Sequence, residues 1–226
     1  MDNENSSTVK HKPDAMCKDF YASDERFSDF VNGAFFDGEQ VIDASMLSDY
    51  DTDVSTYNDE QSKNRYHDVV KCVNINGLKA LIILENQSTY CAEMLYRIKE
   101  YDYNLFLKEY HRFLASNKTR KILNVMNLVL NYNSVPWYGP KSYEDMSECP
   151  PEVFRRFTWF DSFPIIDIIS LDENKFQNKD NRDMIGGLKK LYQWKGNIKA
   201  LEGMVVSKAV ALVLAAMMGD LSLIHI

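Results

Sequence analysis

The pattern of apolar and polar positions is most informative between residues 66 and 87, where two apolar runs flank Asn76 and Gly77. An Asn-Gly pair between two such runs predicts a β-hairpin, because both residues tolerate the positive φ angles that a type I′ turn demands. If the loop contains only these two residues, the numbers of the paired residues sum to 153. A four-residue loop over positions 74–77 would shift the pairing but would keep alternate residues on one face of the sheet.

The same pattern predicts helices on both sides of the hairpin and further strands after it. Apolar residues at helical spacing, good N-caps and apolar runs of strand length mark these elements. Their order of helix, hairpin, helix, strand and strand indicates an α/β fold. The expected elements are a helix over residues 24–35 with its N-cap at Ser23, a long helix from Ser88 or Thr89 to about Leu114, a buried strand within 122–132, a strand within 163–171 and helices between 183 and 219.

Two acids and one amide fall at matching positions of the predicted hairpin. The two-residue loop places Asp68 directly opposite Glu85, and Gln87 lies two residues further along the same strand, so that all three share one face. Two carboxylates about 5 Å apart repel each other, and a bound divalent cation would remove this penalty. The alternative is a pair of separately solvated acids at a fraying strand end. Spacing alone leaves both interpretations open.

The helix after the hairpin carries a candidate phosphate ligand. Arg97 and Tyr101 are one helical turn apart and share a face near the carboxylates, where Arg97 could reach a phosphate. An intramolecular partner such as Asp102 or Glu93 explains Arg97 equally well. A short basic cluster follows, which either contacts a nucleic-acid backbone or is a solvated helix end; it consists of Arg112, Lys118, Arg120 and Lys121.

The length and charge are those of a globular protein whose N-terminal part is acidic. With 226 residues and 45% hydrophobic content, the chain can bury a proper core. Residues 1–62 hold 15 acids and 4 Lys or Arg, a balance of −11, so the remainder of the chain carries +4 of the net −7. That mildly basic remainder neither proves nor excludes contact with phosphates. We expect residues 1–17 to be disordered and residues 48–62 to form a solvated linker.

Cysteine, histidine and hydropathy patterns exclude several classes of protein. The four cysteines form no CxxC pair and the four histidines no HxxxH pair, so neither a zinc site nor a disulfide framework is expected. Reduced thiols suit the cytoplasm, and the N-terminal residues lack the apolar segment of a secretory signal. The most apolar window, residues 209–218, has about half the length that a membrane span requires. We therefore expect a cytoplasmic protein without a membrane anchor.

The final six residues, LSLIHI, are unusual. Translated back into codons they match CTG TCT CTT ATA CAC ATC, the sequence of a mosaic-end adapter used in tagmentation libraries. We therefore expect residues 221–226 to be an artefact and the natural reading frame to continue beyond about Asp220.

Five segments in the same order give the chain a resemblance to the recombination-promoting nuclease (Rpn) family, also known as transposases with a YhgA-like domain. The similarity covers about residues 18–172. Two departures are Leu95, where the family usually has proline, and Gln87, where most nucleases of the wider fold, though not of this family, have lysine. The matching segments are FSDFVNGAFFDGEQVI at 27–42, RYHDVVK at 65–71, LENQS at 84–88, the helix positions Met94, Arg97, Tyr101 and Asp102, and PWYGP at 136–140.

The resemblance implies a restriction-endonuclease-like PD-(D/E)xK core over residues 18–172, followed by a helical region over 173–220. It implies hydrolysis of DNA phosphodiester bonds with Mg²⁺ or Mn²⁺ in the bacterial nucleoid, in the service of recombination, element mobility or defence. An all-oxygen site suits either cation. The implied catalytic residues are Asp68, Glu85, Gln87 and Arg97, the implied metal ligands are Asp68, Glu85 and the Asn86 carbonyl, and Asp29 and Tyr101 are additional candidates.

Two further expectations accompany this reading. Because Gln87 brings no positive charge and cannot take a proton, the alternative function is an inactive nuclease fold that binds DNA or a protein partner. Double-strand cleavage by such folds usually needs two active sites, which makes a homodimer one possibility, but the sequence leaves the oligomeric state open.

Overall fold

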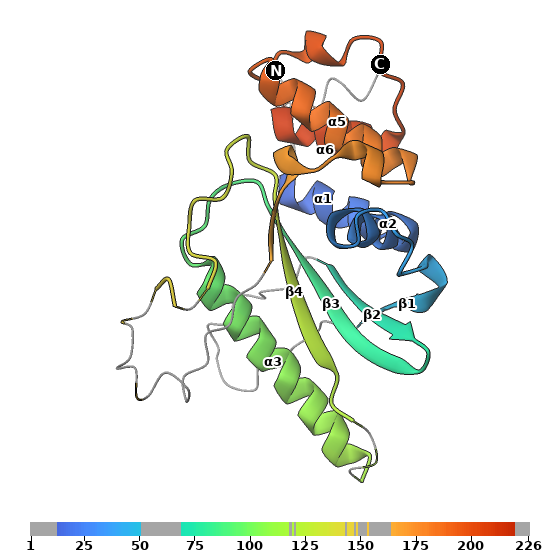
Figure 1. Cartoon of the computed structure of the whole chain (residues 1–226), viewed down its shortest axis with the longest axis vertical. Helices are drawn as coiled ribbons and strands as arrows, with labels where there is room; N and C mark the ends of the chain where they lie inside the picture. The colour runs from blue at the N-terminus through green and yellow to red at the C-terminus, as the bar shows by residue number, and fades with distance from the viewer. Residues whose placement is uncertain are drawn as a thin grey trace, which may run out of the picture.

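The computed structural model describes the residues 13–50, 69–117, 119, 121–142, 144–146, 148, 153 and 164–219. Asp68, the acidic run from residue 51 onward and the final six residues lie outside this part of the chain. The described residues form an α/β fold in which a mixed five-stranded sheet lies between helices (Figure 1).

The strands follow one another across the sheet in chain order. The first three strands are antiparallel, whereas the third, fourth and fifth are parallel, so that the carboxyl ends of these last three meet at one edge of the sheet. The bounds are β1 Leu47–Asp49, β2 Val69–Ile75, β3 Leu78–Gln87, β4 Asn124–Asn131 and β5 Ile165–Asp167.

Helices cover the two faces of the sheet unequally. In Figure 1, α1 and α2 lie on one side of the strands with α5 and α6 beyond them, whereas α3 runs along the other side and connects β3 to β4. The bounds are α1 Pro13–Tyr21, α2 Asp24–Phe35, α3 Met94–Ala115, α5 Lys179–Gln193 and α6 Lys208–Met218, with short 3₁₀ turns at Ala44–Met46, Ile168–Ser170, Glu173–Lys175 and Ile198–Leu201.

The hairpin prediction is confirmed, including its register. Val69 pairs with Leu84, so the paired numbers sum to 153 as a two-residue loop requires. Asn76 and Gly77 have φ angles of 51° and 84°, the positive values that a type I′ turn needs. The side chain of Asn74 accepts a hydrogen bond from the Gly77 N–H at 3.0 Å, which fixes the turn.

Two further elements are confirmed closely. The helix over residues 24–35 is α2, and Ser23 caps it by accepting a hydrogen bond from Arg26 N at 3.3 Å. The strand within 122–132 is β4, which is buried along its second half between β3 and β5. Local signals decided both elements: a capping hydroxyl for the helix and an unbroken apolar run for the strand.

Three predicted boundaries are wrong. Helix α1 begins at Pro13, inside the stretch to residue 17 that was expected to be disordered, because Cys17 buries its side chain in the core and proline suits a first helical turn. Helix α3 begins at Met94, not after Ser88 or Thr89; Ser88 N–H instead donates to Asp14 Oδ1 at 3.0 Å while the chain crosses to the other face of the sheet. The strand expected within 163–171 is shorter, since β5 ends at Asp167.

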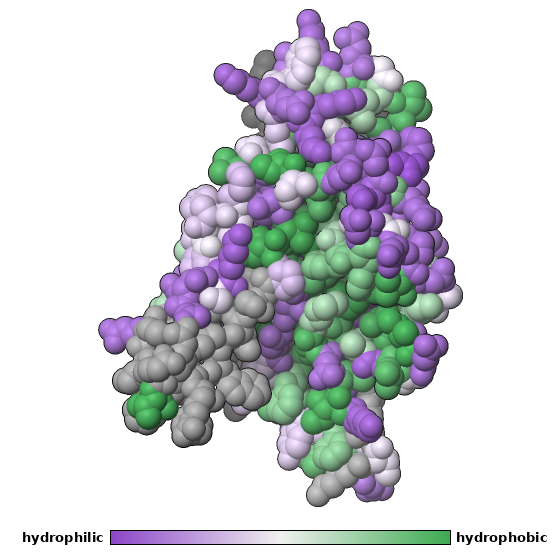
Figure 2. Space-filling model, viewed as in Figure 1, coloured by the Kyte–Doolittle hydropathy of each residue, from purple (hydrophilic) through white to green (hydrophobic). Residues whose placement is uncertain are grey.

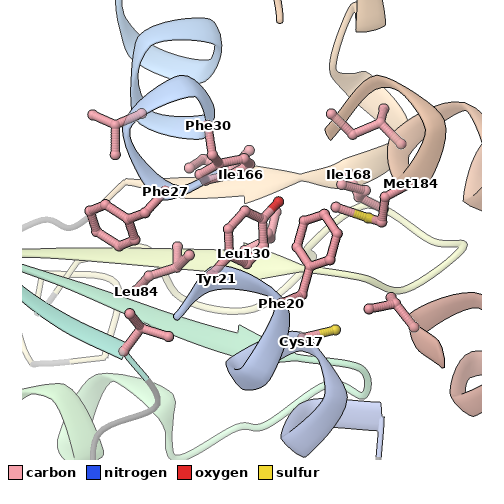
Figure 3. Packing of buried hydrophobic residues seen from close by; sticks show 14 of the residues in the cluster. Cys17, Phe20, Tyr21, Phe27, Phe30, Leu84, Leu130, Ile166, Ile168 and Met184 are labelled. Carbon is pink, nitrogen blue, oxygen red and sulfur yellow. The ribbon is translucent and has the colours of Figure 1, made fainter. Parts of the chain in front are cut away.

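One hydrophobic core spans the chain from α1 to α6. Figure 3 shows aromatic side chains of α1 and α2 beside Leu84 of β3, Leu130 of β4 and Ile166 of β5, with Met184 of α5 nearby. The region after residue 173 therefore belongs to the same core as the sheet. In the space-filling view of Figure 2, hydrophilic residues dominate around α5, whereas hydrophobic residues gather over the hairpin end of the sheet, where Leu78 is 78% exposed.

A buried lysine ties the start of α2 to the sheet. Lys71 Nζ lies 2.7 Å from Asp24 Oδ1 and 2.5 Å from Asp49 Oδ1, and it donates to the Ala22 carbonyl at 2.8 Å. Burial lowers the pKa of this ammonium, but the bonds to the two carboxylates outweigh burial and raise the pKa above its ordinary value. Asp49, at the start of the acidic run, is thus an ion-pair partner of Lys71 and not only a solvated acid.

Candidate active site at the carboxyl ends of the parallel strands

The three parallel strands each end on a polar residue, and these residues are in register. Gln87 ends β3, Asn131 ends β4 and Asp167 ends β5, and the ladder pairs Gln87 with Asn131 and Asn131 with Asp167. The row therefore crosses the sheet edge where α/β proteins commonly place their ligands. All three side chains lie on the face of the sheet that α3 covers, because residues alternate between faces along a strand.

Glu85 lies on this same face, two residues before Gln87, and is fully buried. Its neighbour on β4 is Val129, which packs against Met94 and Ile98 of α3. Burying a carboxylate costs several kcal/mol unless it is paired. Because Glu85 and Gln87 are two residues apart on β3, they share one face, as predicted, and Glu85 lies in a mostly apolar environment beneath α3.

Arg97 of α3 is the cation next to Glu85. Its Nη2 lies 3.8 Å from Glu85 Oε2, and its side chain is 30% exposed. The guanidinium also contacts Tyr101 Oη at 3.5 Å and Cys91 Sγ at 3.9 Å. Burial lowers the pKa of Arg97, but these hydrogen bonds and the charge of Glu85 more than offset burial and raise the pKa. The predicted shared face of Arg97 and Tyr101 is confirmed.

The two intramolecular partners suggested for Arg97 are wrong. Asp102 instead accepts a hydrogen bond from Asn127 Nδ2 at 2.5 Å, which joins α3 to β4. Glu93 occupies the N-cap position of α3 and is exposed. Arg97 turns toward the sheet because Glu85 offers it a buried carboxylate there.

A hydrogen-bond network at Asp167 holds the loop beside the site. The Asp167 carboxylate accepts from Asn131 Nδ2 and from Trp137 N, both at 2.7 Å. Asn131 also donates to the Val135 carbonyl at 3.0 Å and accepts from Asn133 N at 3.1 Å. The loop over residues 133–137 is therefore anchored to the ends of β4 and β5.

Aromatic rings form the outer wall of this loop. Tyr90 stacks on Tyr138 with ring centroids 4.4 Å apart and lies 5.2 Å from the Trp137 ring. The close approach of Tyr90 requires glycine at position 139, because a Cβ there would lie 2.4 Å from the Tyr90 ring. Tyr138 remains 69% exposed, so one face of this wall is open to solvent.

Two of the predicted site residues lie away from Glu85. Asn86 points to the opposite face of the sheet, since its β4 partner Leu130 belongs to the core shared with α1 and α2; only its backbone carbonyl could face a ligand beside Glu85. Asp29 also lies on that far side and is no additional acid of the site. Its carboxylate accepts from Gln177 N at 2.6 Å, from Asn178 N at 2.9 Å and from Asn181 Nδ2 at 2.8 Å.

The basic cluster after α3 is only partly within the described residues. Arg112 Nη1 lies 3.1 Å from the buried Glu109 carboxylate and 2.7 Å from Tyr50 Oη, so this cation has intramolecular partners. Lys118 and Arg120 lie outside the described part of the chain. Arg112 thus serves to fasten Tyr50, beyond the end of β1, to α3.

The oxygen donors at the site are of the type that a hard cation prefers, but the described residues supply too few of them to hold one. Glu85 supplies a carboxylate and Gln87 an amide oxygen on the same face, which are ligands that Mg²⁺ accepts. Among the described residues, which exclude Asp68, no group of three His, Cys, Asp or Glu side chains could hold a metal ion. A metal site here therefore depends on Asp68 for its second carboxylate.

Sequence reasoning missed Asn131 and Asp167. Each is the last residue of an apolar strand, as Gln87 is, so a search for polar residues at successive strand ends would have found the row.

The cysteines described at positions 17, 72 and 91 form no disulfide bond. None of the helices in the described ranges is long and apolar enough to cross a membrane. Comparisons of the chain with protein families, with curated proteins and with solved structures found no match.

Proposed function

We propose that the chain is a divalent-metal-dependent DNA endonuclease with a PD-(D/E)xK core, of the recombination-promoting nuclease type. The observation that carries this proposal is Glu85, a fully buried carboxylate at the carboxyl end of a central parallel strand, with Gln87 on its face and Arg97 at 3.8 Å. Burying this carboxylate costs free energy that its ion pair with Arg97 has to offset, and a chemical role is a reason to keep such a pair.

The antiparallel register supports Asp68 as the second acid of this site. Val69 pairs with Leu84 at the last described rung of the ladder, and Asp68 and Glu85 are the neighbours of these two residues in the sequence. The proposed ligands of Mg²⁺ or Mn²⁺ are the two carboxylates and the Asn86 backbone carbonyl. When bound, the cation lowers the pKa of a water and offsets charge on the phosphate.

The other side chains have positioning roles in this proposal. Gln87 can donate and accept hydrogen bonds but cannot take a proton, so it orients the attacking water without acting as a base. Arg97 keeps its positive charge at any working pH and, being partly exposed, is placed to meet the phosphate of DNA as well as Glu85. Tyr101 holds the guanidinium on this side of α3.

The test is plasmid nicking with Mg²⁺, with Mn²⁺ and with a chelator, comparing wild type with Glu85→Gln and Asp68→Asn. The matched control is Glu109→Gln, because Glu109 is also a fully buried glutamate paired with an arginine of α3, yet it lies about 18 Å along the helix from Arg97. We expect cleavage to be lost in the first two variants and kept in the control. Equal activity of all four proteins, per folded molecule, would refute the assignment.

A second candidate function is a nuclease-like fold that binds DNA or a protein partner without cutting. Two residues favour it. Gln87 stands where most nucleases of the wider fold have lysine, and an amide cannot take a proton as an amine can. Arg97 already pairs with Glu85 and offsets its charge. This candidate predicts no cleavage by wild type and no change of melting temperature with Mg²⁺. The nuclease predicts stabilisation of about 2.7 kcal/mol when Mg²⁺ is present at a hundred times its dissociation constant, and the loss of this gain in Glu85→Gln.

A further inference from the structure

One flank of α3 exposes a row of large apolar side chains. The rings of Phe106 and Tyr110 stack with centroids 6.4 Å apart, and Phe113 continues the stack at 6.3 Å from Tyr110. At 100° per residue the row occupies a sector of roughly 100° beside the buried stripe of the helix. The exposed fractions are 55% for Tyr96, 61% for Tyr103, 49% for Phe106, 40% for Tyr110 and 41% for Leu114.

The other sides of α3 either pack on the sheet or carry polar side chains. The buried stripe, which includes Ile98 and Leu105, faces the sheet. The flank toward β1 is polar: Arg97 contacts Glu85, and Lys108 lies over the Tyr50 ring at 5.6 Å. A solvent-facing helix flank normally carries polar side chains, and contiguous apolar patches of several hundred Å² mark interaction sites. The aromatic flank is thus an unpartnered surface of the described chain.

We propose that this aromatic flank, Tyr96, Tyr103, Phe106, Tyr110 and Leu114, is the interface of a homodimer, with α3 of one copy packed antiparallel on α3 of a second. The exposed parts of these side chains add up to about two and a half whole residues, or roughly 500 Å². If both copies bury these parts completely, the interface reaches roughly 1,000 Å², the size that a specific interface has to clear. The proposal is independent of nuclease activity.

Charge and symmetry select a second copy as the occupant. Lys99 is the one charged side chain among the described residues of this sector, whereas a surface for DNA needs several cations. A two-fold axis near Phe106 sets Tyr103 against Tyr110 of the second copy, and the apolar row then meets its own equivalent. The antiparallel direction also pairs the helix dipoles favourably and keeps the two copies of Lys99 apart.

The experiment is sedimentation velocity on the full chain over a wide concentration range, with Phe106→Glu as the test variant and His111→Glu as its control. His111 is also exposed and lies on the polar side of the same helix, with its ring 6.2 Å from that of Tyr110, so this control tests whether an acid beside the flank, and not within it, weakens the dimer. Both variants add an acid to an exposed helical position, so circular dichroism is expected to show wild-type helix content for both. We expect a wild-type dimer, a dissociation constant at least tenfold higher for Phe106→Glu, and no change for His111→Glu.

A cross-link adds a readout that does not depend on affinity. Phe106→Cys lies next to the proposed axis, so two copies should form an intermolecular disulfide under mild oxidation, whereas His111→Cys should not exceed the wild-type background. A wild type that stays monomeric at every concentration overturns the proposal and assigns the flank to other residues of the chain or to a different protein. A dimer that Phe106→Glu leaves intact also overturns it.

Discussion

Replacing Asp29 by alanine should destabilise the protein without touching the chemistry at Glu85. The Asp29 carboxylate is buried, with 6% of the residue exposed, and it accepts three hydrogen bonds from residues at the start of α5, two of them from the backbone N–H groups of Gln177 and Asn178. Those groups precede or cap the helix and have no intrahelical acceptor there. Asp29→Ala removes the acceptor of all three at once.

The magnitude follows from the type of bond lost. A hydrogen bond to a charged group contributes about 1.5–3 kcal/mol, but three bonds to one carboxylate are not additive, and water can enter part of the space. We therefore expect Asp29→Ala to lower the free energy of unfolding by about 3 kcal/mol. For a chain of this length that corresponds to a fall in melting temperature of roughly 6–12 °C. Asp29→Asn keeps one acceptor oxygen and should cost about half as much.

Urea denaturation followed by circular dichroism measures this change, with Asp19→Ala as the control, because Asp19 is an exposed acid of the neighbouring helix α1. The control should stay within about 0.5 kcal/mol of wild type, as is usual for surface substitutions. If Asp29→Ala is equally neutral, the anchoring role is wrong. If it keeps its stability but loses metal-dependent cleavage, Asp29 belongs to the chemistry after all.

Two more predictions concern packing and proton binding. Gly33→Ala should lower the free energy of unfolding by about 1–3 kcal/mol in the same denaturation assay, because its Cβ would lie 2.5 Å from the buried Phe176 ring. The control Gly186→Ala, whose Cβ would have nothing within 4 Å, should be neutral or slightly stabilising. Equal effects of the two substitutions would refute the contact. Burial raises the pKa of Tyr21 well above its ordinary value and raises that of Tyr192 to about 12. The stability that each neutral phenol provides is complete below about pH 10, and for Tyr192 it is lost as the pH rises through 12. Ultraviolet titration should show these phenols ionising only above pH 10 or on unfolding, and ionisation of all tyrosines together near pH 10 in folded protein would contradict the prediction.

The sequence was sufficient wherever a few neighbouring residues decide the structure. Asn76 and Gly77 fix a turn by their own φ preferences, and this turn sets the register of β2 against β3. Alternation along β3 then places Glu85 and Gln87 on one face. Ser23 likewise fixes the start of α2 through one hydrogen bond to the next turn. In each case the interacting residues are close in the chain, so the pattern carries the whole signal.

Long-range contacts account for what the sequence did not reveal. Asp29 looks like a spare acid until Asn181, far along the chain, supplies its partner. Asp167 lies outside any predicted site because its bonds to Asn131 and Trp137 depend on the parallel order of β4 and β5. The start of α1 at Pro13 is decided by burial of Cys17 against elements that follow much later. The spacing of apolar residues within a short stretch of sequence carries no information about contact partners that lie far away in the chain.

The union of α1 and α2 with α5 has a consequence for synthesis on the ribosome. Phe176 packs on Gly33 and stacks with Phe30 at 6.1 Å, so α2 is covered by a residue that is translated long after it. Until that residue emerges, the nascent chain displays the aromatic side chains of α2, and such surfaces attract chaperones or aggregate. Because α5 packs on α2 and α6 packs on α1, both later helices have to be translated before this surface is covered.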